Sequence, residues 1–262
     1  MNTSQLHRLN VADADVQFYR DHGYFVYGYP LFPSEKFRRL QAFFEGLLAD
    51  LPEGKRPEAM DVPHFAHPEL FEWLLADEVL DFVEAFIGPD IVLWSSHFIS
   101  KPPGDGKRVP WHEDSAYWAP RLSEQEVLTV WLAIDDSMRE NGCMRVVADT
   151  HSHGFSDYVG VDPETHVFGR EIVPEQVDQS RIVDLELKAG QCHIHHAKTV
   201  HGSNANTSSR RRCGYTMRYM PAWVKVLSDG PHAAHAVYLA RGEDRAGNRY
   251  GDPAVRFDPS SR

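Results

Sequence analysis

The chain has 262 residues, of which 42% are hydrophobic and 25% are charged, so it can bury a core of ordinary size and is neither disordered nor collagen-like. Its 27 lysines and arginines against 38 aspartates and glutamates give a formal net charge of −11, which repels the phosphates of nucleic acids and of anionic membranes. No apolar run approaches the roughly 20 residues that span a bilayer, and the sequence starts without a basic region followed by an apolar one. We therefore expect a cytoplasmic protein with no nucleic-acid partner and no membrane partner.

Length favours one domain with an elaboration. We expect a single domain over residues 1–262, with a helical elaboration at 1–90, a β core at 91–221 and a C-terminal extension at 222–262. The three cysteines are widely spaced and include no CxxC pair, which predicts reduced thiols rather than a disulfide framework or a zinc site.

The first ninety residues show the spacing of helices. Asp13 is predicted to cap a short helix that stops at Gly23, and a short strand is expected over residues 24–29. Ser34 is predicted to cap a longer helix, because apolar residues recur there at three- and four-residue spacing. This stripe consists of Phe37, Leu40, Phe43, Phe44, Leu47, Leu48 and Leu51. Two further helices are expected within residues 68–88, the second ended by a Gly-Pro pair.

From residue 91 onward the pattern changes to short strands rich in β-branched and aromatic residues. These expected strands cover residues 91–100, 126–134, 143–147, 181–187, 191–195 and 213–220. Because no helices alternate with them, the sequence predicts a mainly β sandwich or barrel with N-terminal helices. Residues 150–180 are polar, irregular and longer than most loops, which makes them a candidate lid. After residue 221 we expect loops and one short strand.

Fifteen histidines, many of them clustered, make a metal site the first functional hypothesis. His112 and Asp114 are two residues apart, so on an extended segment both side chains project from one face and can grip one ion. His201, where an apolar strand runs into a turn, is the candidate third ligand. Two histidines and one carboxylate on one face are the ligand set of non-haem iron(II) oxygenases.

Five segments that occur in a fixed order resemble the phytanoyl-CoA dioxygenase-like (PhyH) family of iron(II)/2-oxoglutarate oxygenases. They are WHEDSAYW (111–118), TVWLAIDD (129–136), ENGCMRV (140–146), LKAGQCHIHHAKTVHGSNANTSSRRR (187–212) and CGYTMRYMP (213–221). The resemblance implies a double-stranded β-helix, a cupin-like jelly roll, as the core. It also implies Fe(II), 2-oxoglutarate and O2 as cofactor and cosubstrates, and the hydroxylation of an unactivated C–H bond with release of succinate and CO2.

The resemblance assigns metal binding to His112, Asp114 and His201, which makes these the catalytic residues. It places the partner of the far carboxylate of 2-oxoglutarate on Arg212, eleven residues after His201. Arg210 and Arg211 are adjacent, but strand alternation puts Arg211 on the opposite face from the other two. The remaining residues that it assigns to the cosubstrate pocket are Ser203, Thr129 and Trp131. Because halogenating relatives lack the metal carboxylate, Asp114 favours hydroxylation.

The substrate is expected to be a small free metabolite, since no long basic region suits the phosphates of coenzyme A. A cluster of potentially cationic residues precedes the metal motif and could meet an anionic group. The candidate substrate-binding residues are Lys101, His97, Arg108, Tyr117 and Trp118.

A rival hypothesis uses His193 and His195, which share a strand face and resemble the HxH of cupins. It predicts a cupin-like metal-binding protein or isomerase that works without 2-oxoglutarate. Alternatively, His195 or His196 packs beside the oxygenase site. A third hypothesis is a non-catalytic module of the same fold.

Overall fold

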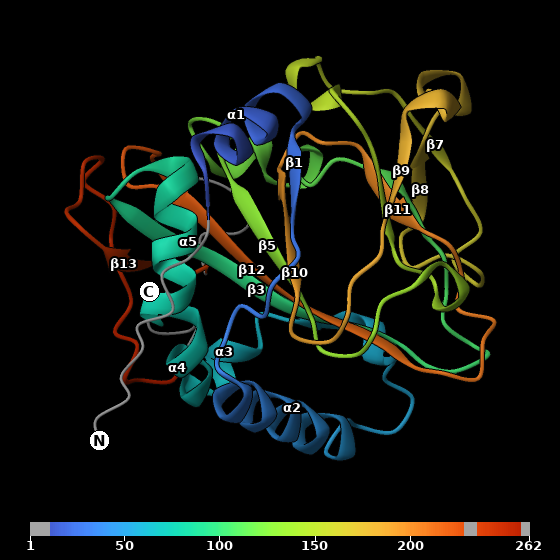
Figure 1. Cartoon of the computed structure of the whole chain (residues 1–262), viewed down its shortest axis with the longest axis horizontal. Coiled ribbons are helices and arrows are strands. Elements are labelled where there is room, and N and C mark those ends of the chain that lie inside the picture. Colours follow the sequence, from blue (N-terminus) through green and yellow to red (C-terminus); the bar gives the residue numbers. More distant parts are fainter. Residues whose placement is uncertain (1–10, 228–234, 258–262) are drawn as a thin grey trace.

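The computed structural model describes residues 11–227 and 235–257 and contains two main antiparallel sheets (Figure 1). The large sheet has the order β1 (Tyr24–Tyr27), β10 (Cys192–His196), β5 (Leu128–Ala133), β12 (Arg212–Pro221), β3 (Ile91–Lys101), β13 (Tyr238–Arg241), with β2 (Met60–Asp61) also paired to β3. The small sheet has the order β4 (Val109–His112), β11 (His201–Ser203), β6 (Met144–Val147), β9 (Ile182–Leu185). A separate ladder pairs β7 (Tyr158–Gly160) with β8 (Arg170–Ile172).

The two faces of the large sheet pack against different partners, because side chains alternate along each strand. In β5, Val130 and Leu132 belong to the main hydrophobic core, which the N-terminal helices complete. Trp131 and Ala133 of the same strand pack with residues of the small sheet instead. The large sheet is therefore buried on both faces, with helices on one side and the small sheet on the other.

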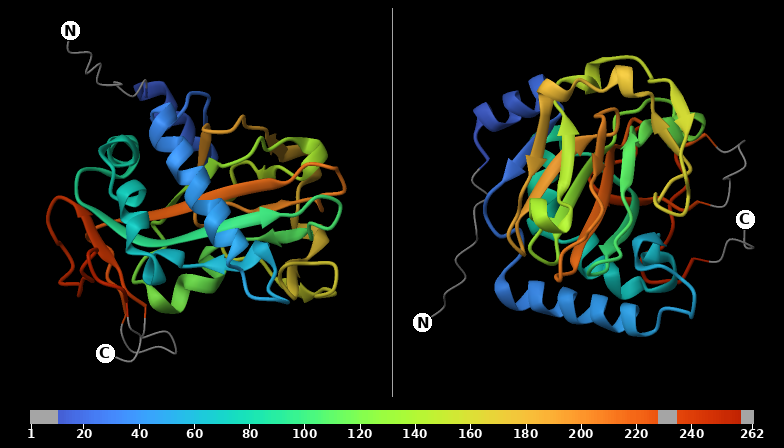
Figure 2. Two further views of the ribbon diagram at one scale, coloured as in Figure 1. Left: turned by 90° about the horizontal axis from the view of Figure 1, so that it is seen from below. Right: turned by 90° about the vertical axis from the view of Figure 1, so that its right-hand side faces the viewer.

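The helices cover one face of the large sheet, and Figure 2 shows α2 lying across it. They are α1 (Asp13–His22), α2 (Ser34–Ala49), α3 (Pro63–Ala66), α4 (Phe71–Leu74) and α5 (Asp77–Ile87). A further helix after the metal motif, α6 (Ser115–Trp118), packs through Trp118 into a separate cluster with Trp94. Short 3-10 helices are Pro57–Ala59, Pro68–Leu70, Ala119–Arg121, Arg139–Asn141, Thr150–Ser152, Pro174–Gln176 and Gln179–Arg181. In α2 the predicted apolar stripe buries Leu40 and Phe44 completely.

Two predicted helix caps are wrong by one residue. Ala12 is the N-cap of α1 and Pro33 that of α2, so Asp13 and Ser34 are the first helical residues. Asp13 still places a negative charge in the first turn, where the helix dipole favours it. Leu51 lies beyond the end of α2. The predicted stop at Gly23 is confirmed, since this residue adopts the left-handed conformation with φ of 77°.

Each strand predicted between residues 91 and 220 is present, and the short strand expected after residue 221 is β13. The candidate lid contains the β7–β8 ladder rather than being wholly irregular. The three cysteines are buried free thiols, as predicted. In the described part of the chain, no helix is long and apolar enough to cross a membrane. Residues 1–10, and residues 228–234 and 258–262 of the expected extension, lie outside the described residues.

Gly214 of β12 allows the Trp131 ring to lie flat against the large sheet. A Cβ built at Gly214 would lie 2.0 Å from a Trp131 ring carbon, whereas one built at the exposed helical Gly46 meets nothing within 4 Å. We predict that Gly214→Ala lowers the free energy of unfolding by about 1–3 kcal/mol through overpacking. The control Gly46→Ala should raise it by about 0.5–1 kcal/mol, because alanine favours the helix. Urea denaturation of both variants measures this, and equal effects of the two changes would contradict the packing argument.

Candidate active site

Three potential metal ligands converge where the small sheet meets the turn that follows it. His112 ends β4 and His201 begins β11, and the two are direct partners across the antiparallel pair, with ring centroids 4.1 Å apart. Asp114 lies two residues after His112, at the start of α6. One ligand atom from each residue lies within 4.8 Å of the others, and all three residues are buried. The local strand pairing thus brings together residues almost 90 positions apart.

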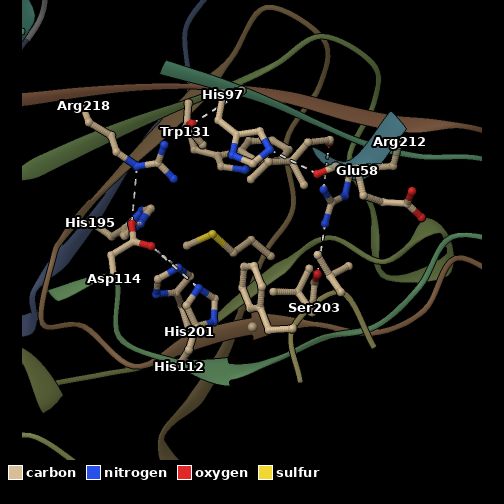
Figure 3. A pocket seen from close by; sticks show the side chains of 17 residues that line it. Glu58, His97, His112, Asp114, Trp131, His195, His201, Ser203, Arg212 and Arg218 are labelled. Carbon is tan, nitrogen blue, oxygen red and sulfur yellow. Dashed lines mark hydrogen bonds and ion pairs between the residues drawn. The ribbon is translucent and has the colours of Figure 1, made fainter. Parts of the chain in front are cut away.

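Backbone carbonyl groups orient both imidazole rings. Nδ1 of His112 donates to the carbonyl oxygen of Pro110 at 2.8 Å, and Nδ1 of His201 donates to that of Thr199 at 2.9 Å. A carbonyl oxygen only accepts, so the proton is assigned to Nδ1, which leaves the lone pair of Nε2 free. These Nε2 atoms lie 3.7 and 4.0 Å from Oδ1 of Asp114 (Figure 3).

Burial keeps the site in the protonation state that a cation needs. Burial, and then the neighbouring His201, lowers the pKa of His112 to about 3. Burial alone would raise the pKa of Asp114. The Arg218 guanidinium and the surrounding histidines outweigh this effect and hold the pKa well below its usual range. Oδ2 of Asp114 is buried without a hydrogen-bond partner. Two neutral imidazoles and an ionised, partly unsatisfied carboxylate fit a divalent cation.

Arg212 and Ser203 form the opposite end of the same cavity. Arg212 donates from Nε and Nη2 to the carbonyl oxygen of Gly142 at 2.9 and 2.7 Å, and from Nη2 to Oγ of Ser203 at 3.1 Å. The face of Trp131 lies 5.2 Å from its guanidinium carbon. Burial lowers the pKa of Arg212 to about 10, so it stays charged at neutral pH. Within the described residues it has no carboxylate partner, and it can therefore receive one from a ligand.

The other two arginines of the RRR run point elsewhere. Arg211 pairs with Asp135 and Glu45 on the outer side of the sheet, and Arg210 pairs with Glu140 at the surface. Neither lines the cavity. Spacing and strand alternation therefore selected the one arginine of the three that faces it.

Of the residues predicted to bind substrate, His97 lines the cavity and the others do not. Lys101 is completely buried, but its ammonium donates to the backbone carbonyl groups of Asn204 and Ser203. Arg108 extends outward to pair with Glu171. In both cases a cation near the site in the sequence has a protein partner, which the sequence pattern did not reveal.

The aromatic and hydroxyl residues among the predictions also differ in position. Trp118 packs with Trp94 in a separate cluster, and Tyr117 contacts His112 edge to face, with ring centroids 6.1 Å apart. Thr129 is buried with its hydroxyl unpaired and does not line the cavity, whereas Trp131 and Ser203 line it as expected.

Several cavity residues were not predicted. Arg218 lies 3.5 Å from Oδ2 of Asp114, measured from its Nε. It is six residues after Arg212 on one strand, so alternation alone could have identified it. Phe168, with its ring 4.9 Å from that of His112, comes from the candidate lid. Glu58, from the 3-10 helix Pro57–Ala59, had no signal in the sequence.

His193 and His195 do not form a second metal site with a third ligand in the described part of the chain, where one such cluster was found. His195 contacts the first cluster instead, with Nε2 3.9 Å from Oδ2 of Asp114, as the alternative placement predicted. His193 stacks on Trp131 at a centroid distance of 5.3 Å. His196 points away and pairs with Glu126 at 3.3 Å. The geometry thus gives the cupin-like hypothesis no support.

Comparison with known proteins identifies the family of this chain. The family model described as phytanoyl-CoA dioxygenase (PhyH) matches residues 19–214, which is more than half of the chain. The chain therefore belongs to the phytanoyl-CoA dioxygenase family. The peroxisomal phytanoyl-CoA dioxygenase of Bos taurus is 30% identical over 159 residues, 59% of this chain and 47% of that protein. A probable alpha-ketoglutarate-dependent hypophosphite dioxygenase of Stutzerimonas stutzeri is 28% identical over 152 residues, 57% and 52% of the two chains.

The matched segment spans about half the length of these curated relatives. Solved structures match over more of their length. The apo form of the non-heme monooxygenase ThoJ has a TM-score of 0.74 and 25% identity, covering 94% of this chain and 90% of its own. The alpha ketoglutarate dependent carbocyclase SnoK has a TM-score of 0.70 at 23% identity, covering 91% and 95%. The second likeness concerns the fold alone.

Neutral buried histidines should make the metal-free protein sensitive to acid. Burial, named first among the causes, lowers the pKa of both His97 and His195 to about 4. In the unfolded chain these groups bind protons below about pH 6.5, so stability falls as the pH drops from there toward the folded-state values. We expect the EDTA-treated protein to lose at least about 1 kcal/mol between pH 7.5 and 5.5 in urea titrations.

His97→Gln should reduce this loss, whereas replacement of the exposed His153 should not. A free energy of unfolding that is flat or rises toward pH 5.5 would contradict the neutral state of these side chains.

Proposed function

We propose that this protein is an Fe(II)- and 2-oxoglutarate-dependent dioxygenase that hydroxylates an unactivated C–H bond of a small-molecule metabolite. One observation carries the proposal: His112, Asp114 and His201 share a single buried cavity with Arg212 and Ser203. Three ligands on one face leave positions open for other molecules. Arg212, which has no carboxylate partner among the described residues, suits the far carboxylate of a dicarboxylic acid. Family membership supports the same chemistry.

In this proposal His112, Asp114 and His201 hold the iron, which when bound supplies oxygen activation coupled to oxidative decarboxylation of 2-oxoglutarate to succinate and CO2. The chain's own residues do the rest. Pro110 and Thr199 fix the imidazole orientations through their carbonyl groups. Arg212 and Ser203 bind and orient the cosubstrate, and Trp131 flanks it. Thr129 does not line the cavity and acts by positioning its strand partners His195 and Arg218, which do.

Hydroxylation is the reaction that the ligand set favours. Asp114 fills the metal position that halogenating relatives leave for a halide. Similar folds also carry out other oxidations, since solved neighbours include proteins titled as an epimerase and a carbocyclase. The outcome therefore depends on which C–H bond the cavity presents.

The architecture that we propose is one oxygenase domain with a jelly-roll core made by the two facing sheets. Residues 150–180 cover the cavity from the small-sheet side, since Val167 and Phe168 line it. About 60 Å³ of the cavity is wide enough to admit a water molecule, which is room for only a few of them. We therefore propose that the substrate is small and that residues 150–180 move to let it enter. Once the substrate is bound, the same segment excludes water from the cavity.

Metal binding separates the oxygenase proposal from its cupin-like rival. His112→Ala should weaken Fe(II) binding by more than about 100-fold. Loss of a residue that only hydrogen-bonds to a metal ligand already lowers metal affinity by about 10- to 100-fold. His193→Ala should leave the stoichiometry near one ion per chain. Anaerobic equilibrium dialysis measures both, and retention of iron by His112→Ala together with its loss in His193→Ala would refute the assignment.

Cosubstrate binding depends on Arg212. We expect Arg212→Ala to raise the KM for 2-oxoglutarate by roughly 10- to 100-fold, since the variant loses charge-assisted hydrogen bonds to the far carboxylate. The matched control is Arg210→Ala, which removes the same charge at the surface. Succinate formation in the absence of added substrate gives the measurement. Equal KM values for the two variants would rule out the role of Arg212.

A further inference from the structure

Arg218 is a buried cation of the cavity that has no full partner. It is 8% exposed and lies on the cavity face of β12, on the side of the metal cluster away from Arg212 (Figure 3). Its nearest carboxylate oxygen is Oδ2 of Asp114, 3.5 Å from Nε, which is an ion pair but not a hydrogen bond. Nε of Arg218 is buried without a hydrogen-bond partner among the described residues, and the guanidinium carbon lies 5.2 Å from the Trp118 ring.

The other charges of the cavity balance without Arg218 once the proposed ligands are bound. A divalent iron is neutralised by Asp114 and by the chelating carboxylate of 2-oxoglutarate. Arg212 is neutralised by the far carboxylate of the same molecule. Glu58 is already held by Arg56, through contacts of 3.0 and 2.7 Å. One positive charge remains, at Arg218.

A buried charge without a counter-charge destabilises the protein. Arginine cannot avoid this penalty by losing its proton. Asp114 offers little relief after metal binding, because its negative charge is then shared with the cation. Other groups near Arg218 bring no compensating charge. The imidazoles of His97 and His195 carry no negative charge whether or not they are protonated, and Thr216 is uncharged.

We propose that Arg218 receives a carboxylate group of the organic substrate. This inference rests on the proposed function and names the substrate class for the same site. The planar guanidinium matches a carboxylate in shape and charge. Because Arg218 contacts the metal ligand Asp114, the substrate's carboxylate would lie beside the metal, and the oxidised C–H bond lies within a few bonds of it. An acyl thioester, which is neutral at that place, is disfavoured.

The test uses acetate as the probe and acetamide as its uncharged isostere. Each is titrated by calorimetry, at constant ionic strength, into anaerobic protein loaded with Fe(II) and 2-oxoglutarate. We expect saturable binding of acetate at least about tenfold tighter than that of acetamide, because a hydrogen-bonded ion pair forms only with the anion. Arg218→Gln should lose this preference, and Arg218→Lys should keep part of it because it retains the charge without the planar fork. Arg210→Gln, with the same change in net charge, should behave as wild type.

The outcomes separate this inference from the function on which it rests. The visible absorption band of the Fe(II)–2-oxoglutarate complex must form first in every protein used, which also shows that each variant folds. If it fails to form in wild type, the proposed function fails. If it forms but acetate does not bind, binds no tighter than acetamide, or binds Arg218→Gln as it binds wild type, the carboxylate assignment is overturned. If Arg218→Gln does not fold, the wild-type comparison still tests the assignment, because acetate that binds no tighter than acetamide would overturn it.

Discussion

The alternation of side chains along the central strands of the large sheet is the constraint on which the structure depends. In β12, Tyr215 and Met217 enter the hydrophobic core beneath the helices, while Arg212 and Arg218 face the cavity. A shift of one residue in the pairing of β12 would exchange the two sets, placing arginines in the apolar core. Register is therefore enforced by burial on both faces, and the same register fixes the position of Arg212 relative to Arg218 along the cavity.

The cavity concentrates charge that the fold alone does not satisfy. Two arginines, one aspartate and one glutamate are buried there, and Oδ2 of Asp114 and Nε of Arg218 lack hydrogen bonds. Such groups destabilise a protein unless a ligand compensates them. A metal, a dicarboxylic acid and an anionic substrate would each remove one part of this cost. Binding of these ligands should therefore stabilise the fold by mass action.

Much of the fold and of the site could be predicted from the sequence, for identifiable reasons. The strands follow from period-two patterns, and His112 with Asp114 follows from the geometry of an extended HxD. Lys101 was misread because the sequence shows a cation near the site but not the carbonyl groups of residues 203 and 204 that its ammonium meets. Glu58 enters the cavity from a segment whose place depends on tertiary packing alone. Arg218, in contrast, could have been predicted from the same strand alternation that favoured Arg212 over Arg211.

The central claim is that one cavity binds iron and 2-oxoglutarate together. The most direct measurement is an anaerobic titration of the metal-free wild-type protein with Fe(II) and then 2-oxoglutarate, followed by visible absorption. The account predicts a weak charge-transfer band that appears only when both are present and saturates at one equivalent of each per chain. Iron that binds at one equivalent but gives no band at any concentration of 2-oxoglutarate would contradict it.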